Sequence, residues 1–270
     1  MFRQFLRVQG VSLAALFDRA DSTPLPALGG MARPDGVVIA SERYFAFANR
    51  DGSILEGDMP ALPNFLRRVP LARGLVRLGM SVSPLLRKDG VAGNTERLVL
   101  TAVFLAPLGF VFISGTASLI LGFAMTIALL AWIMRGRTLF LHGAEHRAIA
   151  AAEEGQLGAT WEDDVRPSRF SLRCGTNFVA LVLPVTLLAD RLWPFAPALW
   201  TPVVLAMLSL GLTMELWRVV QSSTVPMARI FLYPGLGLQR LTTREPTIDE
   251  TRLALTAVAS VLRRELDVTV

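Results

Sequence analysis

Two long apolar stretches, 97–134 and 176–218, dominate the pattern of hydrophobic and polar positions along the chain. A helix needs about 20 residues to cross the apolar core of a bilayer, so each stretch is long enough for two helices. Small polar residues at 114–116 divide the first stretch, and charged and proline-rich residues at 190–197 divide the second. The pattern therefore predicts four membrane helices arranged as two hairpins.

The N-terminal residues are more polar and predict smaller elements. Residues 1–23 place a short apolar stretch between charged positions, which predicts an amphipathic helix on a membrane surface. The proline- and glycine-rich residues 24–36 predict a loop, and an antiparallel meander with a turn at Asp51-Gly52 follows. Arginines alternate with apolar residues over 60–86, which predicts a basic amphipathic helix on anionic lipid headgroups. The strands of the meander are predicted at 37–40, 44–48 and 53–55.

The C-terminal residues combine a connector with a final helix. Residues 233–238 are apolar and rich in glycine, which predicts a break in helical structure. The polar connector 239–246 either docks the last helix or binds a phosphate through Arg240 and Arg244, and we favour docking. A capping box at 247–250 predicts the start of the last helix.

These patterns predict a mainly α-helical, polytopic membrane protein with amphipathic helices and a small N-terminal antiparallel β segment. The predicted parts are an amphipathic helix at 1–23, a cytoplasmic meander and basic helix at 24–96, the first membrane hairpin at 97–134, a cytoplasmic helix and loop at 135–175, the second hairpin at 176–218, and a cytoplasmic motif and helix at 219–270.

Composition supports this class of protein and predicts its orientation. Of the 270 residues, 52% are hydrophobic and 18% charged, against roughly 25% charged in soluble domains. Arginines cluster before the first hairpin, between the hairpins and after the second, so both termini are expected on the cytoplasmic side of the membrane. The net charge of +5 is dispersed and predicts no nucleic-acid partner. The expected partners are anionic lipid and, within the membrane, further copies of the chain or other subunits.

Both histidines of the chain fall in one motif, His142-Gly143-Ala144-Glu145-His146. The surrounding residues 138–154 have a helical pattern, so the two imidazoles lie one turn apart on one face. Two such imidazoles can share one divalent metal ion, and zinc is the first candidate. H-x-x-E-H is the inverted zincin arrangement, in which Glu145 would act as general base on a metal-bound water. The alternative is a helix whose histidines only hydrogen-bond neighbouring groups.

A third metal ligand has two candidates on the same predicted side of the membrane. Glu215 lies at the inner end of the fourth membrane helix, where a carboxylate is costly and indicates a function, unless it only pairs with an arginine such as Arg218. Cys174, the single cysteine, precedes the third membrane helix, where the helix N-terminus favours a thiolate, unless it only fills space. Inverted zincins take a downstream glutamate as third ligand, so Glu215 is the preferred prediction.

Three motifs, in this order, resemble the YqhQ-like family of bacterial membrane proteins, a domain of unknown function (number 1385) described as a predicted metal-dependent enzyme. The motifs are the histidine motif, Arg173-Cys174-Gly175-Thr176-Asn177-Phe178, and Pro234-Gly235-Leu236 with the residues 238–246. The resemblance covers residues 28–266. It implies metal at His142 and His146, together with a small β segment and membrane hairpins around the histidine helix. It implies no particular reaction or substrate.

Two departures indicate a divergent member of that family. The acidic residue of the family's usual N-terminal motif is missing at 28–31, and Ser171 stands where the family often has a histidine. The function best supported is a membrane protein with a metal site on its cytoplasmic face, acting as a metal-dependent hydrolase. The alternative is a non-enzymatic scaffold or accessory subunit of a membrane complex. A transporter is disfavoured, because the first three predicted membrane helices contain no internal charge.

Overall fold

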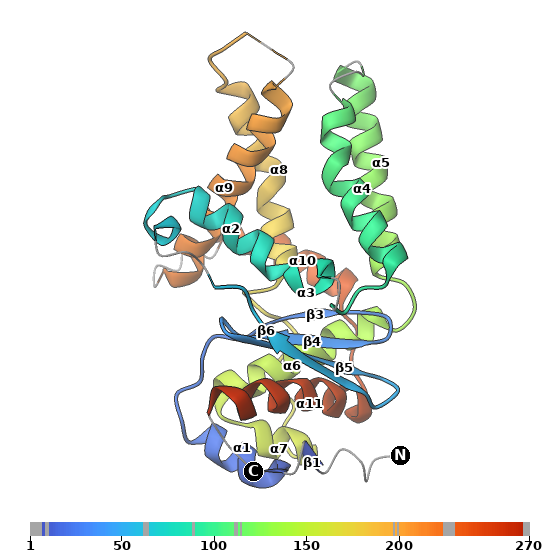
Figure 1. Ribbon diagram of the computed structural model, residues 1–270, viewed down its shortest axis with the longest axis vertical. Coiled ribbons are helices and arrows are strands. Elements are labelled where there is room, and N and C mark those ends of the chain that lie inside the picture. Colours follow the sequence, from blue (N-terminus) through green and yellow to red (C-terminus); the bar gives the residue numbers. More distant parts are fainter. Residues whose placement is uncertain are drawn as a thin grey trace. The chain divides into compact units, whose positions relative to one another are not determined.

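The computed structural model describes residues 7–8, 11–61, 65–87, 90–110, 113, 115–196, 198, 200–223 and 230–266 (Figure 1). Over these residues the chain is mainly helical and contains a small N-terminal sheet of four antiparallel strands. The chain divides into two compact units. The sheet unit comprises Met1–Ala61, Ile133–Cys174 and Gln239–Val270, and the helical unit comprises Leu62–Trp132 and Gly175–Leu238.

The sheet unit contains ten of the described elements and the helical unit most of the others. Those of the sheet unit are β1 (Arg7–Val8), β2 (Val11–Ser12), α1 (Leu13–Asp21), β3 (Gly29–Ala32), β4 (Gly36–Ala40), β5 (Tyr44–Asn49), β6 (Ile54–Asp58), α6 (Thr138–Glu154), α7 (Leu157–Glu162) and α11 (Ile248–Glu265). Those of the helical unit are the 3₁₀ turn Leu66–Arg68, α2 (Ala72–Ser81), α3 (Ser83–Leu86), α4 (Asn94–Phe110), α5 (Gly115–Ile133), α8 (Gly175–Arg191) and α9 (Thr201–Ser222). Helix α10 (Tyr233–Thr242) has residues in both units.

The predicted meander is confirmed and has one more strand than expected. The strand order is β3-β4-β5-β6, all antiparallel. Between β5 and β6, Gly52 takes a positive φ of 92° and the Asp51 carboxylate accepts the backbone N–H of Ser53 at 2.7 Å, as the Asp-Gly turn predicted. The glycine- and proline-rich pattern of residues 24–36 predicts a loop, but Gly29–Ala32 form strand β3. Its glycines are poor strand formers by themselves, but pairing with β4 and packing on α6 hold them in the sheet.

Helices α6 and α11 cover one face of the sheet and pack against each other (Figure 1). Helix α6 begins and ends where the pattern predicted. The capping box is also confirmed: Thr247 Oγ1 accepts the N–H of Glu250, and the Glu250 carboxylate accepts the N–H of Thr247 at 2.8 Å. The two helices and the sheet share one apolar core, whose members include Ile39, Ala46, Leu141, Ala148, Leu255 and Val258.

The predicted N-terminal surface helix is corrected by the structure. Within 1–23, residues 1–6 and 9–10 lie outside the described residues, 7–12 form the two-stranded β1–β2 pair, and only α1 is helical. The apolar side chains of α1 are buried in the core of the sheet unit, where α1 packs against α7 and α11. Because this apolar face is already covered by protein, it is not available to a membrane surface.

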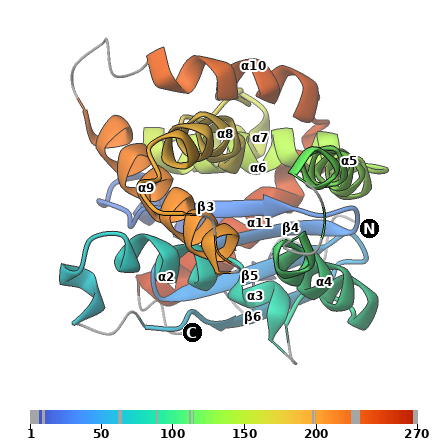
Figure 2. The same ribbon diagram turned by 90° about the horizontal axis from the view of Figure 1, so that it is seen from above.

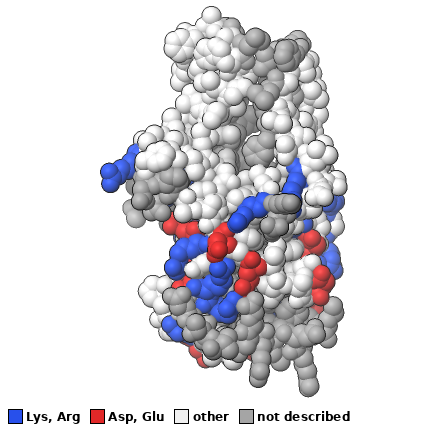
Figure 3. Space-filling view, viewed as in Figure 1, with Lys and Arg blue, Asp and Glu red and all other residues white. Residues whose placement is uncertain are grey.

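The helical unit contains helices at all four positions predicted for the two hairpins. Helices α8 and α9 form an antiparallel hairpin and lie side by side in both views (Figures 1 and 2). Ser114, in the predicted break between α4 and α5, and Pro197, in that between α8 and α9, lie outside the described residues. Many leucines and valines of these helices are exposed, and the upper parts of the helices show no charged side chain on the face drawn in Figure 3.

Of the helices that the structure describes, fewer than four are long and apolar enough to cross a membrane. Among the described residues, one helical segment, Thr201–Gln221 of α9, is long and apolar enough to cross a membrane. A second candidate is the pair Ile120–Ile133 and Thr138–Glu154, which is bent by 76°. The coarse prediction of a helical protein with apolar segments suited to a membrane is supported, and four complete spans stay a prediction.

Two further predictions, for residues 60–86 and for residues 233–238, are corrected by the structure. The basic stretch 60–86 is not one helix but a 3₁₀ turn followed by α2 and α3, and α2 packs against α9. Residues 233–238 were predicted to break helical structure, yet they form the first turns of α10. Pro234 falls in the first turn of α10, where its missing N–H costs nothing. Gly235 lets α10 pass so close to Asn177 that a Cβ would overlap that residue.

Candidate metal centre

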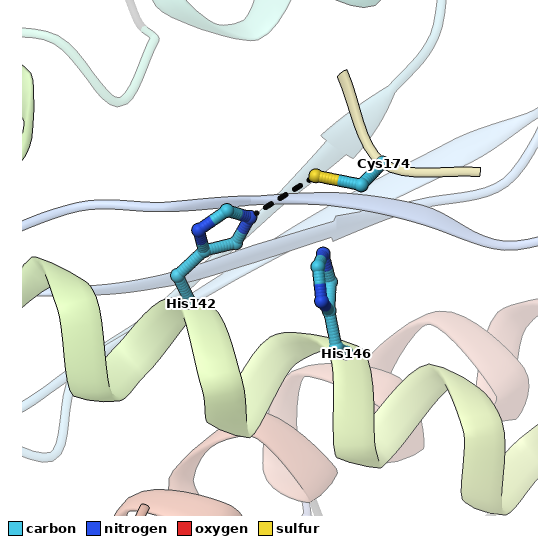
Figure 4. A group of neighbouring side chains, drawn as sticks. All are labelled: His142, His146 and Cys174. Carbon is cyan, nitrogen blue, oxygen red and sulfur yellow. Dashed lines mark hydrogen bonds between the residues drawn. The ribbon is translucent and has the colours of Figure 1, made fainter. Parts of the chain in front are cut away.

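The candidate site is built from three side chains of the sheet unit. His142 and His146 project from the same face of α6, with ring centroids 4.4 Å apart and ring planes inclined by 63°. Cys174 comes from the segment that follows α7, far from the histidines in sequence. Figure 4 shows its sulfur pointing to the two rings. The opposite face of α6 is buried in the apolar core through Leu141, Ala144 and Ala148, which fixes the direction of the histidines.

The donor atoms of these residues converge. Cys174 Sγ lies 3.3 Å from His142 Nε2, and the donor atoms of all three side chains lie within 4.8 Å of one another. The residues are 8%, 8% and 2% exposed for His142, Cys174 and His146 respectively. No other such group of three histidine, cysteine or acidic residues occurs in the part of the chain that the structure describes.

Backbone carbonyls orient both imidazoles. His142 Nδ1 lies 2.8 Å from the carbonyl O of Thr242, and His146 Nδ1 lies 2.7 Å from the carbonyl O of Arg169. A carbonyl can only accept, so each Nδ1 carries the proton and each Nε2 presents its lone pair. His146 Nε2 is buried and has no hydrogen-bond partner among the described residues. A buried polar atom without a partner is costly, and a metal ion would supply the missing partner.

The electrostatic environment keeps both imidazoles neutral. Burial, together with the neighbouring His142, lowers the pKa of His146 to about 3, although the bond to the Arg169 carbonyl opposes this. Burial likewise lowers the pKa of His142, although the bond to the Thr242 carbonyl opposes this. A neutral imidazole is the form that ligates a metal, so neither histidine needs to lose a proton at neutral pH.

The residues fit a zinc-type ion. Zinc binds imidazole nitrogen at about 2.0–2.1 Å and thiolate at about 2.3 Å, so ligands arranged tetrahedrally lie about 3.3–3.7 Å apart. The separation of Cys174 Sγ and His142 Nε2 falls at the lower end of this range, and the His146 donor atom lies within 4.8 Å of both. Two imidazoles and a thiolate suit zinc better than magnesium or calcium, which prefer oxygen ligands.

Glu145, the predicted general base, is buried on a neighbouring face of α6. Its carboxyl accepts the backbone N–H of Ala32 and packs so closely on β3 that a Cβ at Gly30 would overlap it. Burial raises the pKa of Glu145 to about 8, and the bond from Ala32 opposes this. The carboxyl is therefore protonated at neutral pH when no cation is nearby. Its donor atoms are not part of the convergent group.

Glu215, the preferred third ligand, lies in the helical unit with arginine partners. Both of its carboxylate oxygens accept the Arg73 guanidinium, at 2.6 and 2.5 Å, and Arg218 lies 3.2 Å away. The predicted alternative, a pair with Arg218, is thus present, and Arg73 of α2 is the closer partner. Within the sheet unit the structure brings Cys174 to the two histidines, so Cys174 is the third residue of the candidate site.

The backbone carbonyls that orient the two imidazoles were not among the residues predicted from the sequence. The carbonyls of Thr242 and Arg169 carry no side-chain pattern and cannot be recognised in a sequence. Gln239, which hydrogen-bonds Ser171, could have been suspected, because the connector 239–246 holds more polar residues than helical periodicity requires. Arg244 of this connector donates to carbonyls at the end of α10, including that of Arg240 at 3.0 Å, and the choice between docking and phosphate binding stays a prediction.

Comparison with known proteins supports the resemblance drawn from the motifs. The chain is 27% identical over 304 residues to the protein described as "Uncharacterized protein YqhQ" of Bacillus subtilis (strain 168), and the alignment covers 89% of this chain and 93% of that protein. No solved structure matches the chain. The model of the family described as "Protein of unknown function (DUF1385)" matches residues 96–264, more than half of the chain. This chain therefore belongs to the DUF1385 family.

Proposed function

We propose that this chain is a bacterial inner-membrane protein that binds one transition-metal ion, zinc first of all, through His142, His146 and Cys174. The observation that carries the proposal is the convergence of three buried donors around a histidine nitrogen that has no other partner among the described residues. The hydrogen bonds from both Nδ1 atoms to backbone carbonyls support the proposal as well. Histidines that bind a metal usually donate their second ring N–H to a carbonyl or carboxylate.

The number of protein ligands favours a catalytic ion over a structural one. Structural zinc sites have four protein ligands, whereas catalytic sites have three and keep one position for water or substrate. When bound, such an ion lowers the pKa of its water and polarises a carbonyl or phosphoryl oxygen, which is hydrolytic chemistry. Glu145 is the proposed general base, since it is the buried carboxyl next to His146 on the same helix and a nearby cation would favour its charged form.

A second function, a non-enzymatic scaffold, is favoured by the way the site joins separate segments. The ligands come from α6 and from the segment before α8, and an arginine from each of these pairs with the connector after α10. Glu245 of this connector pairs with Arg147 of α6 at 2.5 Å and with Arg169 at 3.4 Å. An ion at this junction would stabilise the sheet unit without any turnover, as structural metals do.

Metal analysis of the purified protein tests the proposal. The untagged chain is purified in mild detergent, and bound metals are measured by mass spectrometry. We expect about one zinc ion per chain for the wild type and for Glu215→Gln, and loss of the ion in Cys174→Ser and in the double variant His142→Ala, His146→Ala. No metal in the wild type would overturn the proposal. Loss of metal in Glu215→Gln with retention in Cys174→Ser would restore Glu215 as the ligand.

The two functions are separated by Glu145→Gln. If the protein is a hydrolase, this variant keeps its metal and loses turnover of the ester and phosphoester substrates that the wild type cleaves. If it is a scaffold, the wild type shows no turnover, and a stoichiometric partner copurifies with it. Retained turnover in Glu145→Gln would remove the base from the proposed mechanism while leaving the metal site in place.

A further inference from the structure

The groups around the two histidines are supplied by two segments that are distant in sequence. Thr242, whose carbonyl orients His142, ends helix α10. Arg169, whose carbonyl orients His146, belongs to the loop that also carries Cys174. Helix α6 supplies only the imidazoles. The geometry of the site therefore depends on how these two segments are held against each other.

One side chain, Gln239, joins them. Its Oε1 accepts the backbone N–H of Ser171 at 2.9 Å, and its Nε2 donates to the backbone carbonyl of Ser171 at 2.7 Å. Two bonds to the N–H and the C=O of one residue fix the orientation of the chain there, not merely its distance. Ser171 stands two residues after Arg169 and three before Cys174, and Gln239 stands three residues before Thr242.

The backbone of Gln239 takes part in the same arrangement. Its carbonyl accepts both the N–H and the hydroxyl of Thr243, at 2.8 and 2.7 Å. The carbonyl of Thr243 in turn accepts the Arg169 guanidinium at 3.2 Å. The end of α10 and the cysteine loop are thus connected at two points, through Gln239 with Ser171 and through Arg169 with Thr243.

Burial makes this glutamine notable. Gln239 is fully buried, with an exposed fraction of 0%. Leucine would fill such a position at a lower desolvation cost, because a buried amide must be compensated by hydrogen bonds. Apolar packing alone therefore does not explain a glutamine here, whereas the requirement to hold Ser171 does.

We propose that Gln239 is a positioning residue of the metal site, whose two bonds to Ser171 fix Cys174 Sγ and the Arg169 carbonyl relative to the histidines. This inference rests on the proposed metal site and deepens it. Residues that hold metal ligands in place without touching the ion typically change metal affinity by about 10–100-fold when they are replaced. The clamp formed by Gln239 and Ser171 belongs to this class.

The test compares zinc affinity, cobalt spectra and unfolding temperature in two variants of the full-length protein. Gln239→Leu removes both bonds, and Gln239→Glu keeps an acceptor for the Ser171 N–H but loses the donor. Zinc affinity is measured by competition with a chromophoric chelator. We expect Gln239→Leu to bind zinc about 10–100-fold more weakly and Gln239→Glu to lie between it and the wild type. In the cobalt-substituted protein, the thiolate-to-cobalt absorption should weaken in the same order, because Cys174 is displaced.

A matched control separates positioning from general loss of stability. Ser260 of α11 is also fully buried and donates to Glu56 of β6, within the same unit but not bonded to any residue of the site. Ser260→Ala should lower the unfolding temperature and leave the zinc affinity and the cobalt spectrum unchanged. If Gln239→Leu behaves like this control, the clamp is only structural and the inference is wrong.

The remaining outcomes are also decisive. If Gln239→Leu fails to fold, Gln239→Glu carries the test, and wild-type affinity and spectrum in that variant would overturn the inference. If the wild type itself binds no zinc or cobalt, both the proposed metal site and the proposed role of Gln239 are wrong. If the wild type binds zinc and both variants bind it equally well, the metal site stands and only the proposed role of Gln239 is wrong.

Discussion

The residue between the histidine and the alanine of the motif, Gly143, is required by a close approach of two chain segments. A Cβ at this position would overlap the carbonyl O of Arg244 and lie 3.2 Å from Pro246. Replacing a helical glycine by alanine would otherwise stabilise the helix by about 1 kcal/mol. Overpacking costs typically about 1–3 kcal/mol, and here the obstacle is backbone rather than a flexible side chain.

We therefore expect Gly143→Ala to lower the free energy of unfolding and to weaken metal binding, because Thr242 lies on the segment that must move. Thermal denaturation and metal analysis measure the two effects. Gly29→Ala is the control, since a Cβ there meets no atom within 4 Å. An unfolding temperature of Gly143→Ala at or above that of the wild type would show that the connector shifts without cost.

The raised pKa of Glu145 predicts that the stability of the metal-free protein depends on pH. Its pKa is about 8 in the fold and 4.5 as the ordinary value, so the fold favours the protonated carboxyl. The stability it contributes is fully present below pH 4.5 and is lost as the pH rises to about 8. Glu145→Gln keeps a neutral group throughout. The unfolding temperature of the wild type should therefore fall relative to that of Glu145→Gln between pH 4.5 and 8, then stay level.

The histidines titrate in both proteins, so their effect largely cancels in this comparison. Glu154→Gln, which changes an exposed carboxylate at the end of the same helix, is the matched control for the loss of one carboxylate. A constant difference between the wild type and Glu145→Gln across this range would contradict the raised pKa and would place Glu145 in contact with water or a cation.

At this scale the sequence named all three residues of the convergent group, although it favoured Glu215 over Cys174 as the third ligand. The spacing of His142 and His146 is local, so helical periodicity alone places both on one face. The third ligand comes from a distant segment, and spacing does not say which downstream residue returns to the helix. Cys174 was named, but Glu215 was preferred by analogy, and its arginine partner on α2 could not be foreseen from periodicity.

At the scale of elements, the capping box of α11 makes a measurable contribution. Thr247 satisfies one N–H of the first turn and holds Glu250, which also pairs with Arg137. Replacing an N-cap threonine by alanine costs about 0.5–2 kcal/mol. We expect Thr247→Ala to lose about 1 kcal/mol, measured by chemical denaturation. Thr247→Ser retains the oxygen and should remain close to the wild type; an equal loss in both would assign the effect to the methyl group instead.

Elements with strong local patterns were predictable, and those held by tertiary contacts were not. Helix α6, the strands β4 to β6 and the start of α11 have periodicity, β-branched and aromatic residues or a cap, and all were anticipated. Strand β3 contains two adjacent glycines and depends on β4 and α6. Helix α10 contains two glycines and a proline, so its local propensity is poor. In both cases tertiary packing outweighs the local preference.

At the scale of the molecule, the two units are interleaved along the chain. The sheet unit is assembled from three separate segments, and the helical unit from the two segments between them. Local patterns reveal the segments but not which of them pack together. The candidate site illustrates this. Its three proposed ligands and the Arg169 carbonyl come from the segment Ile133–Cys174, whereas the Thr242 carbonyl comes from the segment Gln239–Val270. Cys174 is the last residue of that unit before α8 begins.

The orientation in the membrane follows from the distribution of arginines and is the remaining large-scale prediction. Arginines are concentrated before, between and after the two predicted hairpins, and the turn after α8 holds only Arg191. The positive-inside rule therefore predicts that the sheet unit lies in the cytoplasm and that this turn lies outside. Introduced cysteines can test both statements, because the natural Cys174 is buried and should not react in the native protein.

We expect a membrane-impermeant maleimide, applied to intact spheroplasts, to label Leu192→Cys in the turn and not Glu154→Cys at the end of α6; both positions are exposed. After permeabilisation both should react, while the wild type should stay unlabelled. Labelling of Glu154→Cys alone from outside would reverse the orientation. Labelling of neither before permeabilisation would mean that α8 and α9 enter the bilayer without reaching its outer face. The metal site would then still face the cytoplasm, but the second hairpin would not span the membrane.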